Sequence, residues 1–524
     1  SVTADANNNT YICGYTGSLN FPVTAGALQT VKQGLYDAFI TKLDTSGNEI
    51  WSTFYGGAGD ETAYAIDVDN MDNPYLMGYT NGNDILVSGS GVFQSTSNGS
   101  YDAFIVKLDS AGNFIWGTYF GGSGGEFALA GEVDKSNNVV IAGYTSSNDL
   151  PVQNPFQGSM AGALDAFTAK FDSSGNLLWS TYFGGVNTED AHGVHIDNMN
   201  NVIVTGETFS NNFPTSAGAY QNLIAGNKDV FIIKFDSLGN RVFSTYFGGS
   251  VAEDGLGITS DNQLNFYLVG YTESLDFPMI GTGIYQAFKS TDKDGFIAKF
   301  SPQGIPLRTT FLGATAEDRL TAATYSNTGA LYVAGYTNSI DLTLVGTPYQ
   351  SSNNGLFDGF YYKLDSALTP NYSTYFGGVS ADYLRDVIIN KQNQVLTFSG
   401  FSASSDFPTT LNVFQDTLAG QFDAFVFQSD STTIITSFNS SGYGEDDLRV
   451  YPTMFKDEVT LDFSSMDINV ADIYLFDGLG RVVFSKSLKE SISVLHPQGL
   501  TPGVYLLKVV TKGQILKTKK LIKY

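Results

Sequence analysis

Cysteine, histidine and basic residues are scarce in this chain of 524 residues. It has one cysteine and three histidines, and its 27 lysines and arginines face 52 aspartates and glutamates. One cysteine cannot form an internal disulfide, and Cys13 lies in an apolar strand pattern that predicts a buried, unreactive thiol. His192 and His195 are three residues apart, an odd spacing that puts them on opposite faces of a strand and argues against a shared metal.

Long apolar runs and helical periodicity are also missing. No run approaches the length of a transmembrane helix, and no window repeats its apolar residues every 3.6 positions. The Gly-x-Ser-x-Gly, His-Glu-x-x-His and Walker motifs are absent. The sequence therefore predicts neither a helical fold nor a transmembrane segment, and it identifies no catalytic residue.

The negative charge is concentrated in residues 1–444. This part holds 42 acidic and 16 basic side chains, whereas the remainder is nearly neutral. Such an excess predicts repulsion of nucleic acids and of anionic membranes. Neutral glycans, proteins or cations remain as partners.

What the chain does have is a repeat of about 64 residues. An Asp-Ala-Phe or Asp-Gly-Phe sequence, or a close variant, opens an alternating apolar run in seven places. Their aspartates are Asp37, Asp102, Asp165, Asp229, Asp294, Asp358 and Asp423. Gly-Tyr-Thr keeps the same step, with the variants Gly206-Glu-Thr and Gly400-Phe-Ser. Seven copies of one unit are present.

Each unit contains four strand patterns around short turns. In one copy they are AIDVD, NPYLMGYT, YDAFIVKLD and NFIWGTYFGG. Four strands per repeat are typical of propeller blades. The sequence thus predicts an all-β fold, with a seven-bladed β-propeller over residues 1–438 whose first strands are innermost and whose Ser1–Asp5 segment lies beside the last blade. Loops of about twenty residues join the second and third strands, and long loops often carry binding sites.

Two charged positions recur with a constant spacing of 19 residues. One is a lysine in the third strand, and the other is an acid four residues after Tyr-Phe-Gly-Gly. The pairs are Lys42 and Glu61, Lys107 and Glu126, Lys170 and Glu189, Lys234 and Glu253, Lys299 and Asp318, and Lys363 and Asp382. We expect six structural ion pairs, because both members are lost together in the seventh unit, where Gln428 replaces the lysine. The alternative is a ring of carboxylates that binds a cation at the mouth of the central channel.

Aspartate-rich turns raise the question of calcium. Asp69–Asn73, Asp134–Asn138 and Asp197–Asn201 lack the full ligand series of a calcium loop. They predict Asx turns instead, with calcium as the alternative. No cofactor and no metal site are expected.

The repeat stops after Phe438. Asn439–Asp447 is a polar, glycine-containing linker, and residues 448–524 contain six or seven short strand patterns that predict a small β-sandwich.

Both parts resemble known families. The repeat resembles the bacterial SBBP repeat, which is named for seven-bladed β-propellers. The tail resembles the type A C-terminal sorting domain of type IX secretion cargo in Gram-negative bacteria. The matching residues are Val450, Tyr451, Pro452, Asp477, Gly480, Arg481, Gly503, Tyr505, Lys519, Lys520 and Lys523. Met454 stands where many members have a second proline.

The resemblance implies export to the cell surface or the medium. The partners would be the outer-membrane translocon and the cargo-shuttle components, which recognise residues 448–524. A secretory leader would be removed beforehand, and a sortase-like protease would cut near Asn439–Asp447.

Two functions remain open for the propeller. One is a binding or adhesion scaffold for glycans or surface proteins, favoured because every chemical signal recurs. The other is a secreted enzyme that acts on polysaccharides, which would need a blade-specific cluster of side chains in a deep channel pocket.

Overall fold

The structure is a computed structural model of residues 1–524. It describes all residues except 90–91, 291, 391–393, 410–414, 416, 431–448, 452–453, 456–458, 463–470, 477–480, 489–491, 498–499, 502, 512–513 and 524. The chain divides into two compact units, Ser1–Ile435 and Thr436–Tyr524. The expected linker, 439–447, lies outside the described residues.

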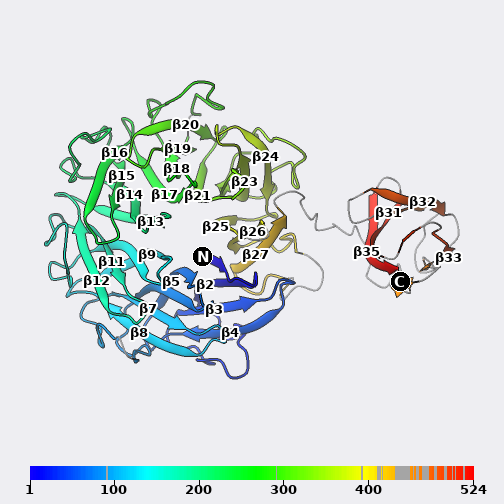
Figure 1. Ribbon diagram of the computed structural model, residues 1–524, viewed down its shortest axis with the longest axis horizontal. Coiled ribbons are helices and arrows are strands. Elements are labelled where there is room, and N and C mark those ends of the chain that lie inside the picture. The colour runs from blue at the N-terminus through cyan, green and yellow to red at the C-terminus, as the bar shows by residue number, and fades with distance from the viewer. Residues whose placement is uncertain are drawn as a thin grey trace. The chain divides into compact units, whose positions relative to one another are not determined.

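The first unit is a ring of seven antiparallel sheets, so the predicted seven-bladed propeller is confirmed (Figure 1). The first strands are β1 (Val2–Ala4), β5 (Glu61–Val68), β9 (Glu126–Val133), β13 (Glu189–Ile196), β17 (Glu253–Ser260), β21 (Asp318–Tyr325) and β25 (Asp382–Ile389). The second strands are β2 (Thr10–Thr16), β6 (Pro74–Thr80), β10 (Val139–Thr145), β14 (Val202–Thr208), β18 (Phe266–Thr272), β22 (Leu331–Thr337) and β26 (Val395–Ser402). The third strands are β3 (Asp37–Leu43), β7 (Asp102–Leu108), β11 (Asp165–Phe171), β15 (Asp229–Phe235), β19 (Asp294–Phe300), β23 (Asp358–Leu364) and β27 (Asp423–Asp430). The fourth strands are β4 (Glu49–Tyr55), β8 (Phe114–Phe120), β12 (Leu177–Phe183), β16 (Arg241–Phe247), β20 (Pro306–Leu312) and β24 (Pro370–Phe376).

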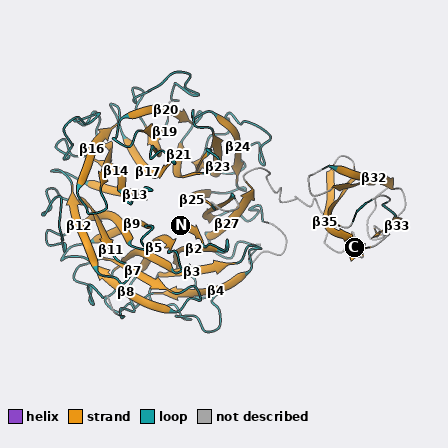
Figure 2. Cartoon of the chain, in the orientation of Figure 1, coloured by secondary structure: helices purple, strands orange, loops and turns teal. Residues whose placement is uncertain are grey.

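Strands follow one another in order within each sheet, from the centre of the ring outward (Figure 1). The described part of the seventh blade has three strands, β25 to β27. Strands and loops make up the described chain (Figure 2), and no helix in it is long and apolar enough to cross a bilayer. The first strand is innermost, as predicted, and its residues line a central channel.

The ring closes between its first and last blades. The Ser1 hydroxyl donates to Asp386 at 2.7 Å, and the Val2 amide donates to the same carboxylate at 3.0 Å. Further out, the Gln428 amide donates to the Thr10 hydroxyl at 3.1 Å. The predicted position of Ser1–Asp5 beside the last blade is therefore confirmed.

Neighbouring blades are joined by a tryptophan that packs on a turn glycine. The Trp51 indole donates to the Ser110 carbonyl of the next blade at 3.1 Å. Gly112 in that turn has φ of +87°, and a Cβ there would lie 3.0 Å from the Trp51 ring. Glycine is required on both counts, and this explains the Gly-Asn step of the third-to-fourth-strand turns.

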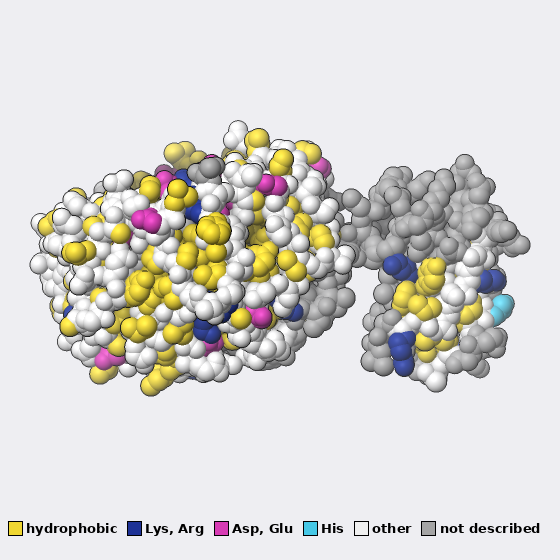
Figure 3. Space-filling view, turned by 90° about the horizontal axis from the view of Figure 1, so that it is seen from above, with side chains coloured by type: hydrophobic (Ala, Val, Ile, Leu, Met, Phe, Trp, Pro, Cys, Tyr) yellow, Lys and Arg dark blue, Asp and Glu magenta, His cyan; other side chains and the backbone are white. Residues whose placement is uncertain are grey.

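Much of the negative charge of the propeller is held inside the blades. Asp102 and Glu126, for example, are fully buried. On the face that Figure 3 shows, charged side chains of the propeller are few and scattered among hydrophobic and uncharged ones. Net charge therefore describes the surface of this domain poorly.

The second unit is a pair of small sheets. One has the strand order β28 (Arg449–Tyr451), β30 (Val459–Asp462), β33 (Ile492–Leu495). The other has the order β29 (Met454–Phe455), β35 (Gln514–Lys523), β34 (Gly503–Thr511), β31 (Ala471–Phe476), β32 (Val482–Leu488). Alternate residues of both sheets, such as Leu461, Leu475 and Leu507, form one buried core. β29 and β33 were missing from the strands expected from sequence, because each is very short.

Candidate functional site

A β-bulge in the first strand aims one side chain per blade into the channel. In the second blade Ala63 pairs with Gly78 and Ala65 with Met77, so Tyr64 is left without a partner in the ladder. The same shift occurs in the next five blades. The bulge residues, which all line the channel cavity, are Tyr64, Leu129, His192, Leu256, Thr321 and Arg385. Bulges commonly re-aim side chains beside functional sites.

The glycine of Gly-Tyr-Thr makes the bulge possible. A Cβ on Gly78 would lie 2.0 Å from the Thr62 carbonyl oxygen, and one on Gly143 would lie 1.8 Å from that of Phe127. Only glycine allows the bulged first strand to approach the second strand this closely. The motif therefore marks the bulge, a link that the sequence analysis missed.

The cavity has a volume of about 1120 Å³ and contains residues from every blade. An aromatic belt surrounds its mouth, where the second strands end and the third strands begin. The belt consists of Tyr15, Tyr36, Tyr64, Tyr79, Tyr101, Phe127, Tyr144, Tyr336, Phe357, Tyr383, Phe401 and Phe422. Its rings touch in series; the Phe127 and Tyr144 centroids, for instance, are 4.7 Å apart.

A charged cluster interrupts the belt at the fourth and fifth blades. It comprises Asp190, His192, Glu207, Lys228 and Asp254. Glu207 occupies the place of the tyrosine in Gly-Tyr-Thr, and His192 is the bulge residue of its blade. This is the blade-specific cluster beside the channel that an enzyme would need.

Contacts within the cluster are close. The Lys228 ammonium bonds to Glu207, donates to the Tyr271 hydroxyl at 3.2 Å and lies 3.9 Å from Asp254 Oδ2. His192 Nε2 lies 3.7 Å from Asp254 Oδ1. Asp190 Oδ1, His192 Nε2 and Asp254 Oδ1 have no hydrogen-bond partner. Polar atoms are thus presented toward one another without being satisfied.

Burial changes the acidity of this cluster. It raises the pKa of Glu207 to about 7, with a further contribution from the nearby Asp254 charge and opposition from Lys228. Burial also raises the pKa of Asp190, while His192 opposes that shift. Perturbed carboxyl groups in a cleft are candidates for function.

The two histidines bind different partners. His195 Nδ1 lies 3.2 Å from Glu132 and its Nε2 lies 2.8 Å from the Ser260 hydroxyl. His192 instead faces Asp254. The structure does not bring the two rings to a common ligand position.

The predicted lysine–acid pairs are wrong in their acidic partner. The Lys107 ammonium is 2.8 Å from Asp69, in the turn after the first strand, and not beside Glu126. The same holds in four other blades. Their pairs are Lys42 and Asp5, Lys170 and Asp134, Lys234 and Asp197, and Lys299 and Asp261, at 2.7–3.3 Å. Ser326 stands at the aspartate position of the sixth blade, where the Lys363 ammonium is 5.6 Å from the Tyr332 ring centre.

The six acids that follow Tyr-Phe-Gly-Gly have another role. Glu61 accepts the Thr80 hydroxyl at 2.5 Å and the Gly57 amide at 2.8 Å. It thereby ties the Gly-Tyr-Thr threonine to the second glycine of the preceding motif. The equivalent acids are also fully buried and accept the equivalent backbone amide; they are Glu126, Glu189, Glu253, Asp318 and Asp382. Such separate, internally bonded groups do not make the ring of carboxylates at the channel mouth that was the alternative.

The aspartate-rich turns are Asx turns. Asp69 Oδ1 accepts the Met71 and Asn73 amides, and Oδ2 receives the Asn73 side chain and the Lys107 ammonium. Asp134 and Asp197 repeat this pattern. A lysine thus holds the position that the calcium alternative would give to the cation.

A recurring glutamine is a further residue that sequence reasoning missed. The Gln94 side chain donates to Asp102 at 2.7 Å and accepts the Gly121 amide at 3.0 Å, so it fixes the long loop to the third and fourth strands. Each blade has this glutamine eight residues before its Asp-Ala-Phe aspartate. That constant spacing was the signal.

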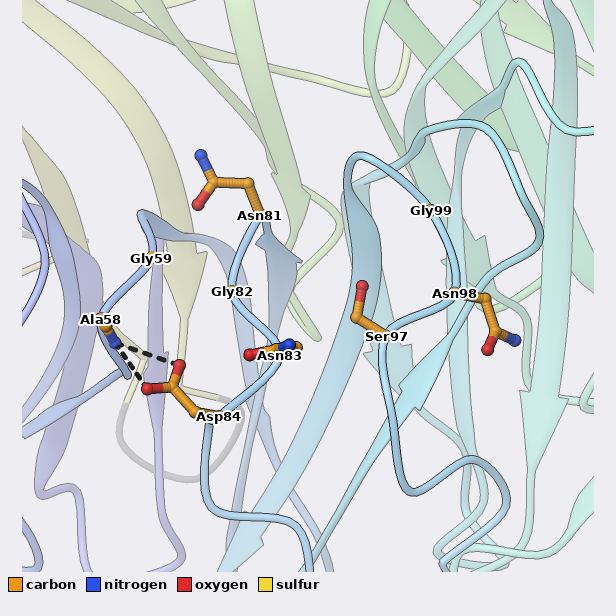
Figure 4. A pocket seen from close by; sticks show the side chains of 9 residues that line it. All are labelled: Ala58, Gly59, Asn81, Gly82, Asn83, Asp84, Ser97, Asn98 and Gly99. Carbon is orange, nitrogen blue, oxygen red and sulfur yellow. Dashed lines mark hydrogen bonds between the residues drawn. The ribbon is translucent and has the colours of Figure 1, made fainter.

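A second pocket, of about 420 Å³, lies among the loops of the second blade (Figure 4). Its Asp84 turns toward Ala58 and accepts the Ala58 amide with both oxygens at 3.1 Å. Asp149 and Asp276 make the same contact in other blades. The pocket therefore belongs to the repeated loop structure.

Stability should decrease between pH 5 and pH 8 because of the buried acids. Burial raises the pKa of Glu61 and of Asp318 to about 7. The folded chain then binds protons that the unfolded chain has released, so stability is greatest near the ordinary carboxyl pKa and falls as pH rises through 7. Each such group contributes on the order of 3 kcal/mol. Melting temperatures measured across this range test the trend. Glu61→Gln should flatten it, and an equally steep curve would contradict the assignment.

The residues of the expected export motif lie in the second unit. Val450 and Tyr451 are on β28, Arg481 precedes β32, Gly503 and Tyr505 are on β34, and Lys519, Lys520 and Lys523 are on β35. Pro452, Asp477 and Gly480 lie outside the described residues. The Tyr505 hydroxyl donates to the Thr501 carbonyl at 2.7 Å. This bond fixes the chain where it enters β34.

Similar proteins fall into two groups. An uncharacterized WD repeat-containing protein of Acanthamoeba polyphaga mimivirus is 22% identical over 57% of this chain and 26% of its own length. The regulatory protein FlaEY of Caulobacter vibrioides is 24% identical over 32% of this chain and 18% of its own. The chain thus spans about a quarter or less of these curated relatives.

Among solved structures, PorZ of Porphyromonas gingivalis, a surface component of the type IX secretion system, aligns over 100% of this chain and 59% of its own, with 13% identity and a TM-score of 0.36. Sqt1 of Chaetomium thermophilum aligns over 76% and 94%, with 10% identity and a TM-score of 0.36.

Residues 449–524 match the family model described as a secretion system C-terminal sorting domain. They are a type IX sorting domain, and the chain is cargo that this system exports across the outer membrane to the cell surface or the medium.

Proposed function

We propose that the propeller is a surface-exposed carbohydrate-binding domain whose binding surface is the aromatic belt. The observation that carries this proposal is a series of touching rings around the mouth of a channel. Tyr15 and Tyr36 are about half exposed there, and their centroids are 5.7 Å apart. Aromatic rings present large apolar faces, and tyrosine adds a hydroxyl for hydrogen bonding. Sugar rings offer both kinds of complementary surface.

The rest of the chain agrees with this role. Export places the propeller where glycans are abundant. The bulge residues give the channel side chains that differ from blade to blade, whereas the framework repeats. The likeness of the repeats to SBBP proteins belongs to this proposal as well.

Removing Tyr15 and Tyr36 together should weaken glycan binding at least tenfold. Each buried aromatic contact contributes about 0.5–1.5 kcal/mol, and 1.4 kcal/mol is a factor of ten. A glycan array would identify a ligand for the wild-type propeller, and titration with that ligand would compare Tyr15→Ala/Tyr36→Ala with Phe288→Ala. Phe288 is 88% exposed and does not line the cavity, so its loss should leave affinity unchanged. Equal affinity of wild type and the double variant would contradict the proposal.

A polysaccharide-acting enzyme is the second candidate, favoured by the charged cluster. A half-buried carboxyl group with a pKa of about 7 beside a channel, as in Glu207, suits general acid catalysis. Cleavage of a polysaccharide by the wild type and its loss in Glu207→Gln would support this function over simple binding.

A further inference from the structure

The charged cluster has the ligand atoms of a metal site. One nitrogen of His192 and one oxygen each of Asp190 and Glu207 lie within 4.8 Å of one another. Tetrahedral zinc with bonds of about 2.0–2.1 Å holds its ligand atoms about 3.4 Å apart. The three side chains must therefore close by on the order of 1 Å, which half-buried side chains can do by small rotations.

Asp254 gives a second, independent indication of a ligand. Its side chain is only 9% exposed, and its Oδ1 has no hydrogen-bond partner. That oxygen faces His192 Nε2, which is also without a hydrogen-bond partner, across 3.7 Å. Buried carboxylates are normally hydrogen-bonded, paired or bound to a metal.

The charges of the cluster do not balance. Asp190, Glu207 and Asp254 carry three negative charges when ionised, and Lys228 supplies one positive charge. Lys228 takes an oxygen of Glu207 and lies near Oδ2 of Asp254, so it leaves Asp190, His192 and Asp254 Oδ1 unclaimed. A cation of charge 2+ at that point would complete the balance.

We propose that Asp190, His192 and Glu207, supported by Asp254, bind a divalent transition-metal ion of the zinc class at the mouth of the channel. An imidazole together with carboxylates suits zinc or manganese, whereas calcium takes oxygen ligands only. His192 lines the channel cavity, so the bound ion would present an open position to whatever enters it. The site does not depend on glycan binding by the aromatic belt.

Zinc titration of the full chain by calorimetry tests the site, with ZnCl₂ as the probe and CaCl₂ as the competitor. The wild type should bind one zinc ion per chain that calcium does not displace. His192→Ala and Asp190→Asn should each weaken this binding at least tenfold. His195→Ala is the matched control, because both ring nitrogens of His195 already have partners, and it should bind zinc like the wild type.

Thermal melting provides a second readout that also reports folding. Zinc should raise the melting temperature of the wild type and of His195→Ala, and should leave that of His192→Ala unchanged. The proposal is overturned if the wild type binds no more zinc than His192→Ala does, or if His195→Ala weakens binding equally.

Discussion

A chain that lacks residues 449–524 should remain inside the cell envelope, with little or none on the surface or in the medium. These residues are the sorting domain that the secretion system recognises. The propeller forms its own compact unit, so its core should survive the deletion. Fractionation of a Gram-negative host with a type IX system, followed by immunoblotting, measures the distribution.

Two controls separate failed export from failed folding. Resistance to limited proteolysis should be the same for the retained and the exported propeller. A reporter domain fused to residues 436–524 and given a secretory leader should reach the medium. Secretion of the truncated chain at the wild-type level would show that export uses another signal.

Asp134→Asn should destabilise the propeller by about 3–5 kcal/mol. The Lys170 ammonium lies 2.7 Å from Asp134, and the two side chains are 2% and 0% exposed. Burial disfavours the Asp134 carboxylate, yet Lys170 and Asn138 hold its pKa below the ordinary value. Loss of one partner leaves a buried charge uncompensated, which costs about 3–5 kcal/mol. Urea unfolding measures the change.

Asp109→Asn is the matched control. Asp109 makes the same Asx turn, with the Ala111 and Asn113 amides on its Oδ1, but it is largely exposed and no lysine contacts it in the described structure. Its replacement should cost about 1 kcal/mol or less. An equal effect of the two substitutions would show that the turn, and not the ion pair, provides the stability.

The seventh blade suggests a rescue. It carries Asn390 and Gln428 where other blades have aspartate and lysine, and the Gln428 amide donates to hydroxyl groups. Asp134→Asn combined with Lys170→Gln should therefore recover most of the lost stability. The joint loss in that blade was a sound reason to expect a paired lysine.

The wrong acid was chosen because of the loop between the true partners. Lys107 and Glu126 are joined by one hairpin, so their spacing is constant at 19 in every blade. Lysine and its real partner are 36 to 38 residues apart, because the loop between the second and third strands varies in length. Constant spacing reported shared backbone geometry and not contact.

The blade count and strand order followed from periodicity, since every blade meets the same backbone requirements. The channel mouth could not be predicted in the same way. The charged cluster joins side chains of two blades, and the bulge that aims His192 inward is invisible to a strict two-residue alternation. Glu207 in the variant Gly206-Glu-Thr was the visible departure from the repeat, and it marked the right blade.

The bulges also bear on how such a protein can evolve. A bulge residue such as Leu129 or Thr321 makes no ladder pairing of its own, so its exchange leaves the backbone of the blade intact. Six positions can then change independently, and the number of channel chemistries open to one scaffold grows multiplicatively. Duplicated genes could diverge in ligand preference through a few substitutions at these positions, without any compensating change in the framework.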